Sequence, residues 1–128
     1  MKLDELRQKK IRIMYLDDDA YMLEVVQTLL NGAGYETGVT RYPTELLSMV
    51  DQGCDLMILD LVWPEMEHLD VCMDLLRDGY TGKIMITSAR NLLIEQWDIF
   101  NGLGFSLLMK PFGPRDLIQH VRQALVSS

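Results

Sequence analysis

This sequence of 128 residues has few cysteines, no long apolar run and no excess of basic residues. The two cysteines, Cys54 and Cys72, are too few for a disulfide scaffold and lack the spacing of zinc ligands, so we expect small buried hydrophobic residues. No apolar run approaches the ~20 residues of a membrane-spanning helix, and residues 1–10 lack the apolar stretch of a secretory signal. We therefore expect a soluble cytoplasmic protein without a membrane partner.

Acidic residues outnumber basic ones, with 19 Asp and Glu against 12 Lys and Arg, and the net charge is −7. Nucleic-acid backbones are bound by clustered Lys and Arg, so we expect no direct nucleic-acid binding by this chain. The acidic balance suits solubility or a divalent cation instead. The length fits one domain, and apolar and charged fractions of 48% and 24% exclude disordered and fibrous classes.

Short apolar runs alternate with stretches in which apolar residues recur at helical spacing. The runs are residues 11–16, 35–40, 55–60, 83–87 and 107–109. The helical sets are Met22, Val25, Val26, Leu29 and Leu30; Leu46, Leu47 and Val50; Val71, Leu75 and Leu76; Ile94, Trp97 and Phe100; and Leu117, Ile118, Val121 and Leu125. This alternation predicts an α/β fold, a (βα)5 doubly wound parallel five-stranded sheet with helices on both faces. We expect it to span residues 11–126, after a preamble at 1–10.

Polar side chains stand where four of the predicted strands end, and parallel sheets bind ligands at that edge. They are Asp17, Asp18 and Asp19 after the first strand, Asp60 at the end of the third, Thr87 and Ser88 at the end of the fourth, and Lys110 at the end of the fifth. Carboxylates close together repel one another unless a cation neutralises them, and magnesium takes such oxygen ligands. We assign that role to Asp17 and Asp18, whereas Asp19 is placed to cap the first helix.

The other strand-end residues suit phosphoryl chemistry. A carboxylate such as Asp60 can attack a phosphoryl group and form an aspartyl-phosphate. The Thr87 hydroxyl can donate to a phosphoryl oxygen, and the Lys110 ammonium is a point charge suited to phosphate. Each residue alone is as well explained by packing or solvation, so the prediction depends on their joint placement at one edge.

Four segments of the chain resemble a response-regulator receiver domain of the chemotaxis type, as found in two-component signalling. They are IMYLDDD at 13–19, DLMILDLVWP at 55–64, IMITSA at 84–89 and LLMKPF at 107–112. The resemblance covers about residues 11–125. It implies the flavodoxin-like strand order 2-1-3-4-5, which makes the four polar strand ends neighbours.

The resemblance also implies individual roles. Asp60 would accept a phosphoryl group from a phosphohistidine on a sensor histidine kinase or phosphotransfer protein. Asp17, Asp18, Asp60 and the backbone carbonyl of Val62 would hold magnesium. Thr87 would bond a phosphoryl oxygen and shift inward on activation. Lys110 would pair with the acids and then with the phosphoryl group, and Pro111 would follow a cis peptide bond. Such a domain is a regulator rather than an enzyme, with at most self-phosphorylation from small donors and self-dephosphorylation.

The resemblance further implies a partner surface on the fourth helix, the fifth strand and the last helix. An output domain, a downstream protein or a second copy of the chain would bind there. Two positions depart from the family pattern. His68 stands where the loop after Pro64 usually has glycine, which serves where φ is positive. Leu107 stands where the family has an aromatic ring that swings inward, so the usual coupling route is in doubt.

One alternative to a phosphorylated receiver domain stays open, and two further protein classes are disfavoured by the sequence. A pseudo-receiver, a phosphorylation-independent interaction module, would explain His68 and Leu107 but not the complete set of polar residues. An enzyme of the haloacid-dehalogenase type would need Thr or Val after Asp17-x-Asp19 and a late pair of acids, which the sequence does not offer. A flavodoxin would need a hydroxyl-rich phosphate loop after the first strand, where the acids at 17–19 would repel phosphate.

Overall fold

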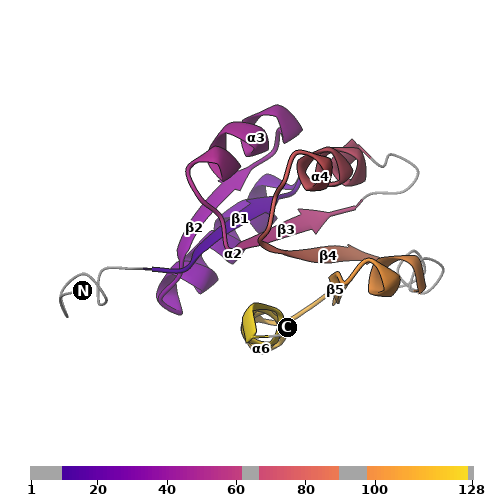
Figure 1. Cartoon of the computed structure of the whole chain (residues 1–128). Coiled ribbons are helices and arrows are strands. Elements are labelled where there is room, and N and C mark those ends of the chain that lie inside the picture. The colour runs from indigo at the N-terminus through magenta and orange to yellow at the C-terminus, as the bar shows by residue number, and fades with distance from the viewer. Residues whose placement is uncertain (1–9, 62–66, 90–97, 127–128) are drawn as a thin grey trace, which may run out of the picture.

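The computed structural model describes residues 10–61, 67–89 and 98–126. Its elements are β1 (Arg12–Leu16), α2 (Ala20–Gly32), β2 (Glu36–Thr40), α3 (Pro43–Asp51), β3 (Leu56–Asp60), α4 (Glu67–Arg77), β4 (Lys83–Ala89), β5 (Ser106–Lys110) and α6 (Pro114–Val126). The strands form one sheet in the order β2-β1-β3-β4-β5, and every neighbouring pair is parallel (Figure 1). The predicted fold class and strand order are confirmed.

The strands are apolar throughout because both faces of the sheet are covered. All five residues of β3 are buried, and in β1 successive side chains serve opposite faces. Met14 and Leu16 belong to the hydrophobic core beneath α3 and α4, whereas Ile13 and Tyr15 belong to the core beneath α2 and α6. This division explains why the strand sequences lack polar alternation.

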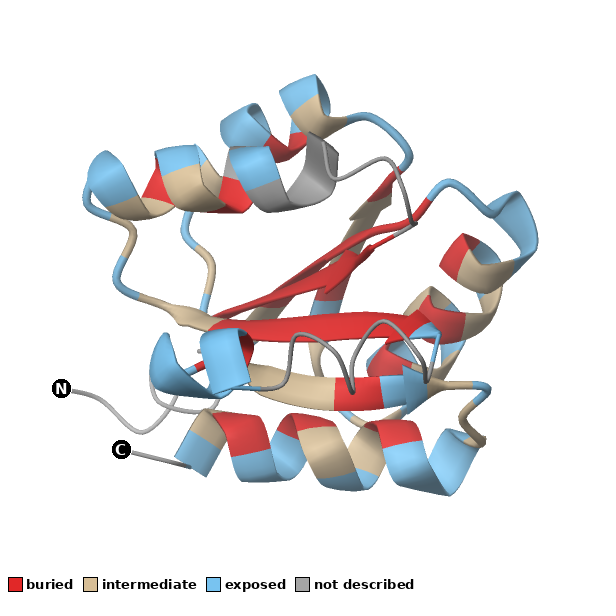
Figure 2. Cartoon of the chain, turned by 90° about the vertical axis from the view of Figure 1, so that its right-hand side faces the viewer, coloured by how far each residue is buried: buried red, intermediate tan, exposed pale blue. Residues whose placement is uncertain are grey.

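The helices form two layers with the sheet between them. α3 and α4 contact each other on one face, and α2 and α6 contact each other on the opposite face (Figure 1). Residues 98–102 are also helical, and Phe100 within them is buried and stacks on Phe105 with ring centroids 6.3 Å apart. Figure 2 shows the buried strands at the centre and exposed residues on the outer helix surfaces.

Several sequence expectations need correction in detail. In α3, Leu47 is 40% exposed, although the sequence predicts it on the same helix face as Leu46. In α2, Leu23 is buried, although it is not among the residues predicted for the inner face of that helix. Helix α3 is short and contacts the sheet mainly through Leu46, so a neighbouring position faces outward. Ile94 and Trp97, predicted to lie in the core beside Phe100, fall outside the described residues.

Strand ends also differ from the prediction by one or two residues. β4 continues to Ala89 because Ser88 and Ala89 pair with Met109 and Lys110 of β5, and tertiary pairing of this kind leaves no local sequence signal. Cys72 is buried as expected, but Cys54 is only half-buried, and both are free thiols. Among the helices that the structure describes, none is long and apolar enough to cross a membrane.

Candidate phosphoryl-transfer site

Four of the predicted polar residues converge at the carboxyl edge of the sheet. Asp17 directly follows β1, and Asp60, Thr87 and Lys110 lie at or near the ends of β3, β4 and β5. Asp60 and Thr87 are register partners in adjacent parallel strands. The strand order therefore gathers residues that are distant in the sequence.

A single ammonium group joins the two buried carboxylates. Lys110 Nζ lies 2.8 Å from Asp60 Oδ1 and 3.0 Å from Asp17 Oδ2. Asp17 and Asp60 are 1% and 4% exposed, whereas the Lys110 side chain keeps 26% of its surface in solvent. Buried charges need such partners, because an unpaired carboxylate in the interior loses its hydration without compensation.

The environment of Asp60 makes its proton unusually hard to lose. Burial, followed by the nearby charge of Asp17, raises the pKa of Asp60 to about 6, although Lys110 opposes the rise. The hydroxyl of Thr87, itself fully buried, donates to Asp60 Oδ1 over 3.3 Å. At pH 7 Asp60 is therefore mainly an ionised, poorly solvated carboxylate, the form that a nucleophile needs.

Lys110 is held in its charged form. Burial alone would lower the pKa of Lys110, but its hydrogen bonds and charge interactions with Asp60 and Asp17 outweigh burial and raise that pKa. A permanent cation thus faces the edge where a transferred phosphoryl group would carry its negative charge.

Asp17 is fixed by donors from three directions. Its Oδ2 accepts from the Tyr15 hydroxyl and from Lys110, and its Oδ1 accepts from the backbone N–H of Asp19 at 2.9 Å. The contact with Tyr15 was missed at the sequence level. A signal was available, because Tyr15 is the one aromatic residue in an otherwise aliphatic run at 13–16 and stands two positions before Asp17 on the same strand face.

The neighbouring acids divide their roles. Asp19 is the N-cap of α2, with Oδ1 accepting from the N–H groups of Tyr21 and Met22, so its predicted capping role is confirmed. Asp18 is exposed at the start of the same loop. Val62, whose carbonyl is a predicted magnesium ligand, lies outside the described residues.

Two further features lie beside the site at the carboxyl ends of the strands. Ser88 Oγ donates to the carbonyl of Leu61 over 2.6 Å and so ties the end of β4 to the residue after Asp60. The sequence had indicated only that Ser88 is small. The predicted cis peptide bond between Lys110 and Pro111 is present.

The donor set at this edge fits magnesium chemically. Two carboxylates on adjacent strands share one cation, and magnesium typically uses one or two carboxylates together with water and phosphate oxygens. Over residues 10–61, 67–89 and 98–126, no three His, Cys, Asp or Glu side chains form a ready-made metal cluster.

The two departures from the family pattern have different outcomes. His68 lies in the first turn of α4 rather than in a loop, and no non-glycine residue in the described part of the chain has positive φ. The expected strain at His68 is therefore absent, because a helical backbone suits any L-residue. Leu107 is half-buried against the core beneath α3 and α4, as an aliphatic side chain without a ring to rotate.

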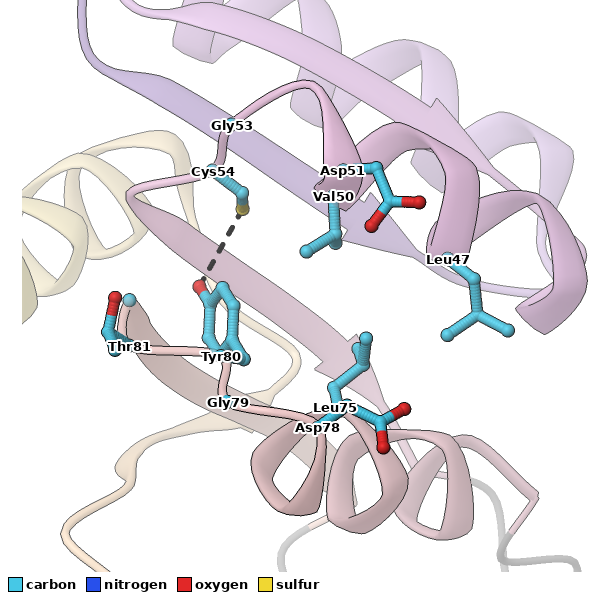
Figure 3. A pocket seen from close by; sticks show the side chains of 11 residues that line it. Leu47, Val50, Asp51, Gly53, Cys54, Leu75, Asp78, Gly79, Tyr80 and Thr81 are labelled. Carbon is cyan, nitrogen blue, oxygen red and sulfur yellow. Dashed lines mark hydrogen bonds between the residues drawn. The ribbon is translucent and has the colours of Figure 1, made fainter.

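A separate groove opens at the other end of the sheet, where the strands begin. It has a volume of about 660 Å³ and lies between α3 and α4 (Figure 3). Cys54, Tyr80 and Gly82 line it just before β3 and β4 begin, whereas Asp60 and Thr87 are near the other ends of these strands. The groove therefore takes no part in the chemistry of the acidic edge.

Comparison with known proteins agrees with this geometry. The sequence matches the family described as the response regulator receiver domain over residues 13–122. It is 35% identical to the DNA-binding response regulator MtrA of Mycobacterium tuberculosis over 124 residues, which cover 96% of this chain and 53% of that protein. The transcriptional regulatory protein CpxR of Klebsiella pneumoniae is 27% identical over 114 residues, 89% of this chain and 49% of that protein. The chain thus spans about half the length of these curated relatives.

Solved structures share the fold. The chemotaxis protein CheY4 of Vibrio cholerae has a TM-score of 0.80 at 21% identity, covering 91% of this chain and all of that one. A CheY-like receiver domain protein of Methanospirillum hungatei has a TM-score of 0.79 at 24% identity, covering 91% and 94%. Neither these matches nor the described residues support the pseudo-receiver alternative.

Proposed function

The chain belongs to the response regulator receiver domain family, regulatory modules of two-component signalling rather than classical enzymes, and from this premise we propose that Asp60 is its phosphoacceptor. The observation that carries the proposal is the pair of contacts from Lys110 to Asp60 and Asp17, which gathers a nucleophile, a second acid and a fixed cation at one edge. We take the functional unit to be residues 11–126, working in the cytoplasm, where ATP is available to a histidine kinase.

The transfer begins from a donor phosphohistidine on a sensor kinase or phosphotransfer protein. An ionised oxygen of Asp60 attacks phosphorus, the O–P bond forms, and the P–N bond of the donor breaks. The donor imidazole leaves with the bonding electron pair and takes up a proton. Later, water attacks the same phosphorus, the bond to the Asp60 oxygen breaks, and inorganic phosphate leaves while the carboxylate is restored.

The chain's own residues prepare this step. Burial and the Thr87 hydroxyl hold Asp60 in place, and Lys110 supplies positive charge for the phosphoryl oxygens. Asp17, Asp18, Asp60 and the Val62 carbonyl would hold magnesium. The chemistry that this ion supplies when bound is neutralisation of charge on the phosphoryl oxygens.

After transfer, the partners of Lys110 and Thr87 change. A phosphoryl group on Asp60 offers both residues new oxygens, and Thr87 would move toward them. Ser88 follows Thr87 and its hydroxyl donates to the Leu61 carbonyl, so a movement of Thr87 would also shift Leu61 and the end of β4. Such a charge change needs an element with two arrangements to carry the signal.

The surface that we propose for partners is made of residues 98–103, β5 and α6. Ile99, Leu103 and Met109 are large apolar side chains exposed by 58%, 45% and 43%, and Arg115 and Arg122 of α6 are exposed beside a shallow pocket. An output domain, a downstream protein or a second copy of this chain would dock there. Because the relatives are named as DNA-binding or transcriptional regulators, we propose control of transcription as the output, through a partner segment rather than through this acidic chain.

A direct test uses magnesium and acetyl phosphate as a small donor, with intact-mass spectrometry as the measurement. The wild-type protein should gain one phosphoryl group, and Asp60→Asn should gain none. Asp51→Asn, an exposed acid of α3, is the matched control and should be modified like the wild type. Modification that persists in Asp60→Asn, or that never appears in the wild type with several donors, would rule the proposal out.

A further inference from the structure

Tyr15 places a hydroxyl against the acidic edge from inside the protein. The residue is fully buried in the core beneath α2 and α6, and its hydroxyl donates to Asp17 Oδ2. Asp17 directly follows β1 and stands two residues after Tyr15, so continued strand alternation places both side chains on the same side of the sheet. Burial raises the pKa of Tyr15 far above its usual range, so the phenol remains a hydrogen-bond donor.

The oxygen that Tyr15 binds is also the one that Lys110 binds. Each carboxylate oxygen has two lone pairs, and Asp17 Oδ2 has two donors, the Tyr15 hydroxyl and Lys110 Nζ at 3.0 Å. The other oxygen, Oδ1, accepts from the backbone of Asp19. Asp17 Oδ2 therefore has no lone pair left for a further cation while both side chains remain in place.

The two donors differ in freedom. Tyr15 is fixed because its ring is packed in the core and has no exposed surface. Lys110 has a long flexible stem at the end of β5, and 26% of its side chain is exposed. Of the two lone pairs on Asp17 Oδ2, the one that Tyr15 holds is permanently occupied, and only the one that Lys110 holds can be exchanged.

We propose that Tyr15 is a positioning residue that forces the Lys110 ammonium and a magnesium ion, or its bound water, to compete for one lone pair of Asp17 Oδ2. The inference rests on the proposed magnesium site and deepens it. Its consequence is a weakened affinity for magnesium in the unphosphorylated protein. A phosphoryl group that draws Lys110 toward itself would then release the lone pair, so that magnesium binding follows the state of Asp60.

The test replaces only the hydroxyl, in Tyr15→Phe, and measures the magnesium Kd by isothermal titration calorimetry without a phosphodonor. Removing a charge-assisted hydrogen bond frees one lone pair of Asp17, so magnesium should bind about tenfold more tightly. Tyr80→Phe is the matched control. The Tyr80 hydroxyl donates to the Lys83 carbonyl at the opposite edge of the sheet, so its loss should leave the magnesium Kd unchanged.

A second pair of variants separates competition from a general loosening of the fold. Lys110→Met removes the competing ammonium and should tighten magnesium binding in the wild-type background. In the Tyr15→Phe background the same change should have a smaller effect, because magnesium already has a free lone pair there. Thermal unfolding followed by circular dichroism verifies that each variant is folded, and Tyr15→Phe alone decides the question if Lys110→Met does not fold.

The outcomes are distinguishable. Tighter binding in Tyr15→Phe but not in Tyr80→Phe supports the inference. Unchanged or weaker binding in Tyr15→Phe, or equal effects of Lys110→Met in both backgrounds, overturns it while the proposed magnesium site stands. A wild-type protein that binds no magnesium overturns both.

Discussion

Lys110 Nζ lies 2.8 Å from Asp60 Oδ1 and thereby connects the ends of β5 and β3 across the intervening strand β4. The same ammonium reaches Asp17 beyond β1, so one cation holds three strand ends together. Without it, two buried carboxylates would face each other with little solvent to screen them. The Lys110 ammonium therefore stabilises the folded, unphosphorylated protein.

We expect Lys110→Met to destabilise the protein by about 3 kcal/mol at pH 7 without magnesium, because it leaves buried carboxylates unpaired. Urea unfolding in EDTA measures the loss. In an Asp60→Asn background the same substitution should cost much less, because only one of the two carboxylates still needs the cation. Equal losses in both backgrounds would show that Lys110 acts through packing alone.

Asp60 should give the protein a distinctive pH dependence. Its pKa is about 6 in the folded state and 3.8 when unperturbed, so between about pH 4 and pH 6 the folded state binds more protons than the unfolded state. The contribution of Asp60 to the free energy of unfolding therefore falls as pH rises through this window, by about 3 kcal/mol in total. Asp60→Asn removes this contribution.

The measurement is the difference in free energy of unfolding between Asp60→Asn and the wild type, in EDTA, from pH 4 to pH 7. The difference should grow in favour of Asp60→Asn as pH rises. A constant difference would mean that Asp60 titrates near its ordinary pKa. Phosphorylation by acetyl phosphate should also decline below about pH 6, because a protonated carboxyl group is a poor nucleophile.

The sequence predicts this edge well because its signals are local. Asp17, Asp60 and Lys110 stand directly at the ends of apolar runs, and a parallel sheet brings such ends together. The strand order that makes them neighbours came from the resemblance, since periodicity alone does not order strands. The Ser88 bond to the Leu61 carbonyl was not predicted, because it depends on a rotamer that only the packed sheet defines. The contact of the Tyr15 hydroxyl with Asp17 was also not predicted, although the spacing of two residues along the strand was a signal for it.

Magnesium should stabilise the fold through Asp18 but not through its neighbour Asp19. At a concentration about 100-fold above Kd, the ion adds about 2.7 kcal/mol, measured as a rise in melting temperature. Asp18→Asn should lose this response and gain stability in the absence of metal through reduced repulsion among the acids. Asp19→Asn is the matched control, because asparagine is an equally good N-cap and the variant should keep the response. A magnesium response that survives in Asp18→Asn would remove Asp18 from the ligand set.

The last prediction concerns how the phosphorylated state is communicated. Leu107 packs against the core as an aliphatic side chain, so the ring movement of the family has no counterpart here. Thr87 donates to Asp60, and the next residue, Ser88, donates to the Leu61 carbonyl, so we expect the signal to pass through the end of β4 into the residues that follow it. Beryllofluoride, a phosphoryl mimic, should change hydrogen exchange in residues 88–95, of which 90–95 lie outside the described structure, more than around Leu107.

A substitution of Leu107 also tests whether the signal of phosphorylation passes through β5. Leu107→Ala should leave phosphorylation of Asp60 intact and change the affinity for a partner or a second copy only modestly. Partner affinity is measured before and after phosphorylation, with Asp60→Asn as the inactive reference. Loss of activation-dependent association in Leu107→Ala, or exchange changes concentrated in β5, would place the signal in β5. The residues that follow β4 would then not carry the signal, even though Asp60 remained the phosphoacceptor.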